Sequence, residues 1–403
     1  MIEIDSDNPE VEKQFRLMAE VILDSGGSFE PSVKILCQEG NLTVVANTAS
    51  RSKAPTMHCP ESCLLPMDEV QLALDGGEMA VVKTPDYYST ERRALLEAML
   101  AIYRETRKIS TTRETSFWFT LAETPDIFEH FLGPRKMLPK FQYFFKMFES
   151  DDTEQLLINY FLGSRTLAYR SPASEGQDVQ TEEMDPADDK FVLMPFVDFA
   201  NHHEHGAPFD SRRGGVALGD VRPIPGSREI FARYGIIDGL DCYLNYGFVD
   251  TGASFVRAAP MEVDLEGLGT LKIGARVMSP VKKKLSGKIA GLRTFIPRVL
   301  TKTEDMLEAS HLFIPGHRSP QALVRVISLL IRSMDRVAPD QIIREQVRQV
   351  EEAVIAMTET YYTDLQKMTE SASLGASTRD SLNTLATHQL RKIRAYKPVF
   401  AGV

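Results

Sequence analysis

The chain has 403 residues, a length at which two or three domains are expected, and its apolar and charged contents of 43% and 25% are those of an ordinary globular protein. This composition excludes collagen-like, coiled-coil and largely disordered chains. The net charge of -10, from 46 Lys and Arg against 56 Asp and Glu, argues against nucleic-acid binding through phosphate neutralisation. The run 175–189 has seven acidic residues and no basic one, so it supplies most of the net charge and predicts a solvated loop.

Targeting and membrane signals are not evident. The N-terminal sequence MIEIDSDNPE is acidic and polar, whereas a secretory signal needs a positive segment and then an apolar run, so we predict no export. The most apolar stretches fall short of the roughly 20 residues that a bilayer span requires. The few cysteines argue against a disulfide scaffold and predict free thiols in a reducing, cytoplasmic compartment; they are Cys37, Cys59, Cys63 and Cys242.

The first half of the chain begins β-rich and then becomes helical. Short β-branched runs at 33–37 and 42–46 flank Gln38-Glu39-Gly40-Asn41 and predict a hairpin. After Ser89 the apolar residues fall at helical spacing, which predicts a helix ending near Arg107. Two further helices are predicted at 141–148 and 154–167.

The second half alternates before it becomes helical. Strands are predicted at 191–194, 215–218 and 229–234, and a short helix at 240–246. Around residue 280 the composition turns basic, from Lys282 to Arg298, and we place a domain boundary there. The chain beyond it is predicted to be helical, with Ser319 and Pro320 opening a helix to about 336 and a long amphipathic helix over 347–368.

A cluster of polar residues at 197–205 suggests metal binding as a first hypothesis. His203 and His205 would point the same way on a strand, and with Glu204 or Asp198 they could form a hydrolytic metal site. The neighbouring His202 would diverge from them, and no distal set of ligands is evident. We therefore favour no bound metal, here or at the C-x3-C pair of cysteines, and keep metal-dependent hydrolysis as an alternative.

The order of several motifs resembles a known family. Asp198, Asn201 and His202, followed by Tyr234-Gly235 and then Tyr246-Gly247-Phe248, resemble the C-terminal half of a SET-domain methyltransferase. The resemblance is closest to the Rubisco large-subunit methyltransferase branch and spans about 28–275. Glu39-Gly40-Asn41 resembles the opening hairpin of that family, and Ser164-Arg165 resembles the pair that closes its inserted helical region. Leu42 stands where the family usually has a second glycine, and Leu167 where an aromatic residue often follows the arginine.

The resemblance implies an α+β fold with three parts. A SET-type β core would occupy 1–280, with a helical insert at about 88–190. An all-α lobe at 281–403 would dock a protein substrate. The implied activity is methyl transfer from S-adenosylmethionine to a lysine nitrogen of a protein.

The resemblance also assigns roles to residues. Arg165 would bind the methionine carboxylate of S-adenosylmethionine, and the other cofactor-binding residues would be Glu39, Gly40, Asn41, Asn201, His202 and Phe248. Tyr234 would orient the acceptor amine, and Tyr246 would help to set how many methyl groups fit. Ser164 and Asp198 would lie near the acceptor.

Other functions stay open at this point. Leu167 suggests a wider acceptor pocket, so the acceptor could instead be a histidine or a small molecule. Leu42 suggests a catalytically silent SET-like binding module. No nucleic-acid or membrane partner is expected for any of these readings.

Overall fold

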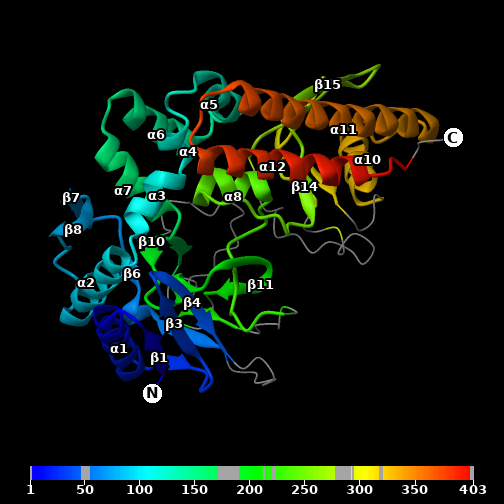
Figure 1. Ribbon diagram of the computed structural model, residues 1–403. Helices are drawn as coiled ribbons and strands as arrows, with labels where there is room; N and C mark the ends of the chain where they lie inside the picture. The colour runs from blue at the N-terminus through cyan, green and yellow to red at the C-terminus, as the bar shows by residue number, and fades with distance from the viewer. Residues whose placement is uncertain are drawn as a thin grey trace. The chain divides into compact units, whose positions relative to one another are not determined.

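The computed structural model describes residues 2–46, 55–170, 190–211, 214–219, 224, 226–276, 292, 295–316 and 321–399 (Figure 1). These residues form two compact units. The first comprises Met1–Glu114 and Met147–Gly235, and the second comprises Thr115–Lys146 and Ile236–Val403. The acidic run 175–189, the domain boundary expected at 280 and the helix opening at Ser319 and Pro320 lie outside the described residues.

The described residues of the first unit form four small β-sheets. The largest has the strand order β13-β11-β12-β5-β2, and β1-β3-β4 and β6-β10-β9 have three strands each, while β7 pairs with β8. The strand bounds are β1 Glu3–Ser6, β2 Ser28–Phe29, β3 Lys34–Gln38, β4 Asn41–Val45, β5 Met57–Pro60, β6 Leu65–Pro66, β7 Gln71–Asp75, β8 Glu78–Lys83, β9 Leu167–Tyr169, β10 Lys190–Leu193, β11 His202–Asp210, β12 Gly215–Leu218 and β13 Ala232–Arg233.

Helices cover these sheets with their apolar faces. α1 and α2 lie side by side in Figure 1, and Ser89 caps α2 by accepting a hydrogen bond from Arg92 N. The buried face of α2 includes Leu95, Met99 and Tyr103, at the helical spacing that the sequence predicted. The bounds are α1 Pro9–Asp24, α2 Thr90–Glu105, α3 Lys108–Thr115 and α7 Thr153–Gly163, with single turns η1 Glu61–Cys63 and η5 Val197–Phe199.

In the second unit, the residues that the structure describes form two sheets and a group of helices. β14 (Phe255–Arg257) pairs with β19 (Phe313–Pro315), and the other sheet has the order β15-β16-β18-β17. The long helices α11 and α12 lie side by side (Figure 1). The remaining bounds are β15 Met261–Leu265, β16 Gly269–Ile273, β17 Val299–Lys302, β18 Met306–Ala309, α4 Phe117–Thr120, α5 Pro125–Leu132, η2 Gly133–Arg135, α6 Pro139–Glu149, α8 Gly239–Tyr246, α10 Gln321–Met334, α11 Asp340–Ser371 and α12 Ala376–Ala395.

The mixed α+β fold class, with a helical C-terminal region, is confirmed. Three local predictions are wrong. The helix predicted over 154–167 ends at Gly163, because the Ser164 hydroxyl donates to Phe161 O and closes the last turn. The strand predicted over 229–234 is reduced to β13. The region after 280 is not helical throughout, because 299–315 forms β17, β18 and β19, and β18 and β19 pair with β16 and β14.

Two further observations concern compartment and membrane. All four cysteines are buried and carry free thiols, as the sequence predicted. Over the described ranges, none of the helices combines the length and the apolar character that crossing a bilayer demands.

Candidate functional site

An ion pair lies at the centre of the candidate site in the first unit. Arg165 follows the end of α7, and its Nη1 lies 2.8 Å from Oδ2 of Asp198, which sits in η5. The same carboxylate oxygen accepts a hydrogen bond of 2.7 Å from the hydroxyl of Tyr103 on α2. Three segments that are distant in sequence therefore meet at one oxygen atom.

Two neighbouring aromatic rings, 5.0 Å apart, lie close to the guanidinium of Arg165. Its Cζ lies 5.0 Å from the centroid of the Tyr103 ring and 4.7 Å from that of Phe161. Burial alone would lower the pKa of Arg165, but Asp198, Tyr103 and Tyr234 raise it above its ordinary value. The guanidinium therefore keeps its proton and its charge. The side chain is 20% exposed. Within the described residues, its buried Nε has no hydrogen-bond acceptor.

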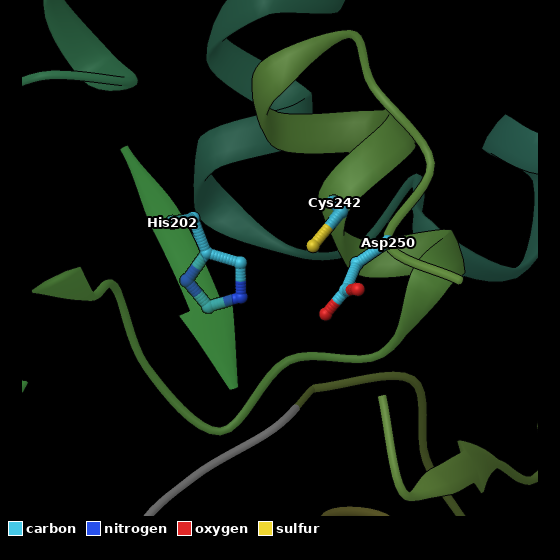
Figure 2. Close-up of side chains that lie close together, drawn as sticks. All are labelled: His202, Cys242 and Asp250. Carbon is cyan, nitrogen blue, oxygen red and sulfur yellow. The ribbon is translucent and has the colours of Figure 1, made fainter. Parts of the chain in front are cut away.

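The pairing of β11 with β13 places Tyr234 against His202. Tyr234 N donates to His202 Nδ1 at 3.2 Å, and the two ring centroids are 5.1 Å apart. The Tyr234 hydroxyl donates to the carbonyl oxygen of Ala200 at 2.9 Å. Figure 2 shows His202 at the start of β11. The charge of Tyr234 also contributes to raising the pKa of Arg165.

Asn201 joins the β11–β13 pair to the N-terminal hairpin. Its Nδ2 donates to Glu229 Oε1 at 2.6 Å and to the backbone carbonyl oxygen of Leu42 at 3.4 Å. The backbone carbonyl oxygen of Asn201 accepts from Ala232 N at 2.8 Å. The Leu42 side chain is buried. Leu42 therefore packs into the interior and presents its backbone carbonyl to Asn201.

Glu39, Gly40 and Asn41 form the turn of the predicted hairpin. Glu39 and Gly40 have φ values of 52° and 78°, so both central residues are left-handed, as a two-residue turn between twisted strands requires. Glu39 N donates to Asp7 Oδ2 at 2.7 Å. Asn41 is paired with Gln38 and exposed. The structure thus brings the start of β4 into contact with Asn201 through Leu42.

The two remaining residues assigned by the resemblance, Tyr246 and Phe248, belong to the second unit. Tyr246 ends α8, and burial raises the pKa of its hydroxyl. Its ring centroid lies 6.0 Å from that of Phe248, and Phe248 is 37% exposed. One turn earlier on α8, Cys242 Sγ lies within 4.8 Å of an oxygen of Asp250 (Figure 2). The placement of Tyr246 and Phe248 beside Tyr234 stays a prediction.

Ser164 and Asp198, predicted near the acceptor, are engaged in contacts within the chain. The Ser164 hydroxyl donates to Phe161 O at 2.7 Å, and Asp198 accepts from Arg165 and Tyr103. Tyr103 was not singled out from the sequence, where its helical spacing indicated only a core residue. Nothing in the local sequence indicates that it reaches Asp198, 95 residues away.

The histidines that suggested a metal site contact one another locally on β11. His205 N donates to His203 Nδ1 at 3.0 Å, and His205 Nε2 lies 3.2 Å from Glu204 Oε1. Asp198, one of the two carboxylates that such a site could use, is bound to Arg165 instead. The absence of a metal at this cluster stays a prediction.

Comparison with known proteins gives matches among solved structures only. No model of a protein family matches the chain, and neither does any curated protein. The chain is similar to SET-domain structures. The SET domain of LSMT bound to lysine and AdoHcy is 12% identical with a TM-score of 0.39, over 96% of this chain and 91% of that chain. The same domain bound to MeLysine and AdoHcy is 12% identical with a TM-score of 0.41, over 96% and 90%.

Both solved structures are of the SET domain of LSMT. Their identity and TM-scores are too low to transfer the role of any residue. Residue roles in this chain therefore rest on its own motifs and contacts.

Proposed function

We propose that the chain is an S-adenosylmethionine-dependent N-methyltransferase that acts on a lysine of a protein substrate. The observation that carries the proposal is the convergence of Arg165, Asn201, His202 and Tyr234 in the first unit. Arg165, the adjacent pair Asn201-His202 and Tyr234 come from three separate parts of the sequence and were assigned to one site from motif order. Their contacts with Asp198, Leu42 and Ala200 hold them together.

The residues fit the chemical groups of the cofactor. Arg165 is a partly exposed cation with an unused buried Nε in the described structure, and a carboxylate is the group that a guanidinium binds best. Asn201 and His202 would hold the rest of the cofactor, beside the hairpin turn at Glu39 and Gly40. S-adenosylmethionine, when bound, would supply a methyl group already activated on its sulfonium sulfur.

The task of the protein is then to align and desolvate the acceptor. An ammonium has no lone pair, so the lysine must lose its proton before its nitrogen bonds to the methyl carbon as the bond to sulfur breaks. The Tyr234 hydroxyl already donates its proton to Ala200 O, so its oxygen can only accept further hydrogen bonds. It is suited to accept an amine N–H and thereby to orient the nitrogen lone pair.

The proposal is tested by methyl transfer from radiolabelled S-adenosylmethionine into a protein extract. We expect labelled protein with the wild-type chain and none with Tyr234→Phe, while Tyr143→Phe, at an exposed tyrosine, should behave as wild type. Hydrolysis of the labelled protein should release methylated lysine. Label in histidine or in a small molecule would support the first alternative, and the absence of cofactor binding would support the silent module.

Two further parts of the proposal concern partner and compartment. We expect a protein substrate to dock on the C-terminal helices α10, α11 and α12, which is tested by crosslinking a substrate once one is labelled. We expect the cytoplasm as the compartment because all four cysteines are free.

A further inference from the structure

The backbone at Phe196, just before η5, adopts a conformation that a bulky residue rarely takes. Phe196 has φ and ψ angles of 72° and -48°, and Val197 N donates a hydrogen bond of 2.9 Å to Pro195 O across it. This hydrogen bond between residues two apart closes a γ-turn of positive φ, which is rare and strained. For a phenylalanine a positive φ is an outlier, so the folded chain must offset the conformational cost of this turn.

Aromatic packing holds Phe196 in this turn. Its side chain is buried, and its ring centroid lies 5.4 Å from that of Phe15 on α1 and 4.4 Å from that of Phe29 on β2. The Phe15 ring also lies 5.0 Å from that of Phe199 in η5. We call these four residues the ring cluster. A strained conformation persists only where its surroundings determine it, and packing against rings from two other elements supplies that constraint.

The turn leads directly into the ion pair of the candidate site. Asp198 N donates to Met194 O at 2.9 Å, so the backbone closes over the strained residue. The Asp198 carboxylate then accepts from Arg165 and Tyr103. Burying an aromatic ring does not require a left-handed backbone, so packing alone does not account for the turn. Strained residues cluster at functional sites because their geometry is used there.

We propose that Phe196 is a positioning residue of the S-adenosylmethionine site. The ring cluster holds the turn, and the turn presents Asp198 to Arg165, whose guanidinium binds the methionine carboxylate of the cofactor. Phe196 acts through Asp198 and takes no part in the methyl transfer. This inference rests on the proposed function and adds to it a residue that determines the direction of the cation.

The strain of the turn is tested by two truncations of the same side chain. Phe196→Ala and Phe196→Gly both remove the ring, but only glycine adopts a positive φ without steric cost. We expect Phe196→Gly to be at least as stable as Phe196→Ala in urea unfolding. An alanine variant that is clearly the more stable of the two, as at an ordinary backbone position, would overturn the inference.

The positioning role is tested with two ligands that differ in the carboxylate. S-adenosylhomocysteine carries the amino-acid part, whereas 5′-methylthioadenosine keeps the adenosine and the sulfur but has no carboxylate. In calorimetric titration, the preference of the wild type for S-adenosylhomocysteine should fall about 10-fold in Phe196→Gly, because Arg165 is no longer held in place. Phe29→Leu leaves the turn residue unchanged and removes one ring of the cluster, so the same preference should fall about threefold.

The control variant lies on the same helix as Phe15. Ile22 is buried on α1 outside the ring cluster, so Ile22→Ala should lose stability but keep the wild-type preference between the two ligands. A wild-type preference in both Phe196→Gly and Phe29→Leu would overturn the inference while the proposed function stands, and so would an equal change in Ile22→Ala. If the wild-type chain binds neither ligand, the proposed function fails and the role of Phe196 fails with it.

Discussion

Asp198 accepts hydrogen bonds from Arg165 and Tyr103 at a single carboxylate oxygen, at 2.8 and 2.7 Å. Arg165 comes 33 residues earlier in the chain than Asp198, and Tyr103 comes 95 residues earlier. The carboxylate thus ties the ends of α2 and α7 to η5. In the proposed function, this is the contact that orients the cation for the cofactor.

Removal of the Asp198 charge should destabilise the first unit. Asp198→Asn keeps the shape of the side chain but leaves Arg165 without its counterion, and breaking a buried pair typically costs about 3–5 kcal/mol. Because Arg165 is partly exposed, we expect about 2–4 kcal/mol from urea unfolding. Asp68→Asn, at an exposed position, should cost less than about 0.5 kcal/mol. Equal costs for the two variants would show that the ion pair contributes nothing.

Tyr234→Phe should separate binding from chemistry. The variant loses the hydroxyl that is bonded to Ala200 but keeps the ring that packs on His202. We expect the affinity for S-adenosylhomocysteine to change less than about threefold and the rate of methyl transfer to fall at least about 100-fold. A variant that transfers methyl groups at the wild-type rate would remove Tyr234 from the chemistry.

The second unit should lose stability in acid through His311. This buried histidine lies 2.9 Å from Ser310 Oγ, and burial and the charge of Arg257 lower its pKa from 6.5 to about 4. Between these values the unfolded chain binds a proton that the folded chain does not, so stability falls as the pH is lowered through this window. We expect a contribution of about 1–3 kcal/mol.

The measurement is urea unfolding of the wild type and His311→Leu at pH values from 7 to 4. Carboxylates titrate in both proteins, so the difference between the two pH-dependent losses of stability isolates His311. The wild type should lose more stability than the variant as the pH falls. Parallel losses would contradict the assignment.

Gly247 should not tolerate a side chain. It ends α8 with a φ of 76°, and a Cβ there would lie 2.5 Å from Thr115 Oγ1. Gly247→Ala should therefore cost about 2 kcal/mol or more in thermal or urea unfolding. Gly375→Ala is the control, because Gly375 has a φ of -59° and its Cβ would meet nothing within 4 Å. If both variants unfold alike, the steric argument is wrong.

Local features of the sequence predicted the parts of the fold that local physics determines. Glu39 and Gly40 marked the β3–β4 turn because two adjacent left-handed residues need a glycine or a tolerant polar residue. Ser89 marked the start of α2 because its hydroxyl replaces a missing helical acceptor. The strands at 299–315 were missed because their short runs depend on pairing with β14 and β16, not on their own periodicity.

The candidate site was predicted only in part for the same reason. Motif order assigned Arg165, Asn201 and Tyr234, and contacts within the first unit are consistent with that grouping. The hydrogen bond from Tyr103 to Asp198 depends on a tertiary contact between α2 and η5, which no local pattern encodes. Sequence reasoning therefore gave the residues of the motif but not the side chain that supports them.

The central claim is that the first unit binds S-adenosylmethionine through residues that include Asn201. Calorimetric titration with S-adenosylmethionine and S-adenosylhomocysteine tests it most directly, with Asn201→Ala as the test variant and Asn383→Ala on α12 as the control. We expect micromolar binding by the wild type and the control, and at least about tenfold weaker binding by Asn201→Ala, which loses its bonds to Leu42 and Glu229. No binding by the wild type at millimolar ligand would contradict the account.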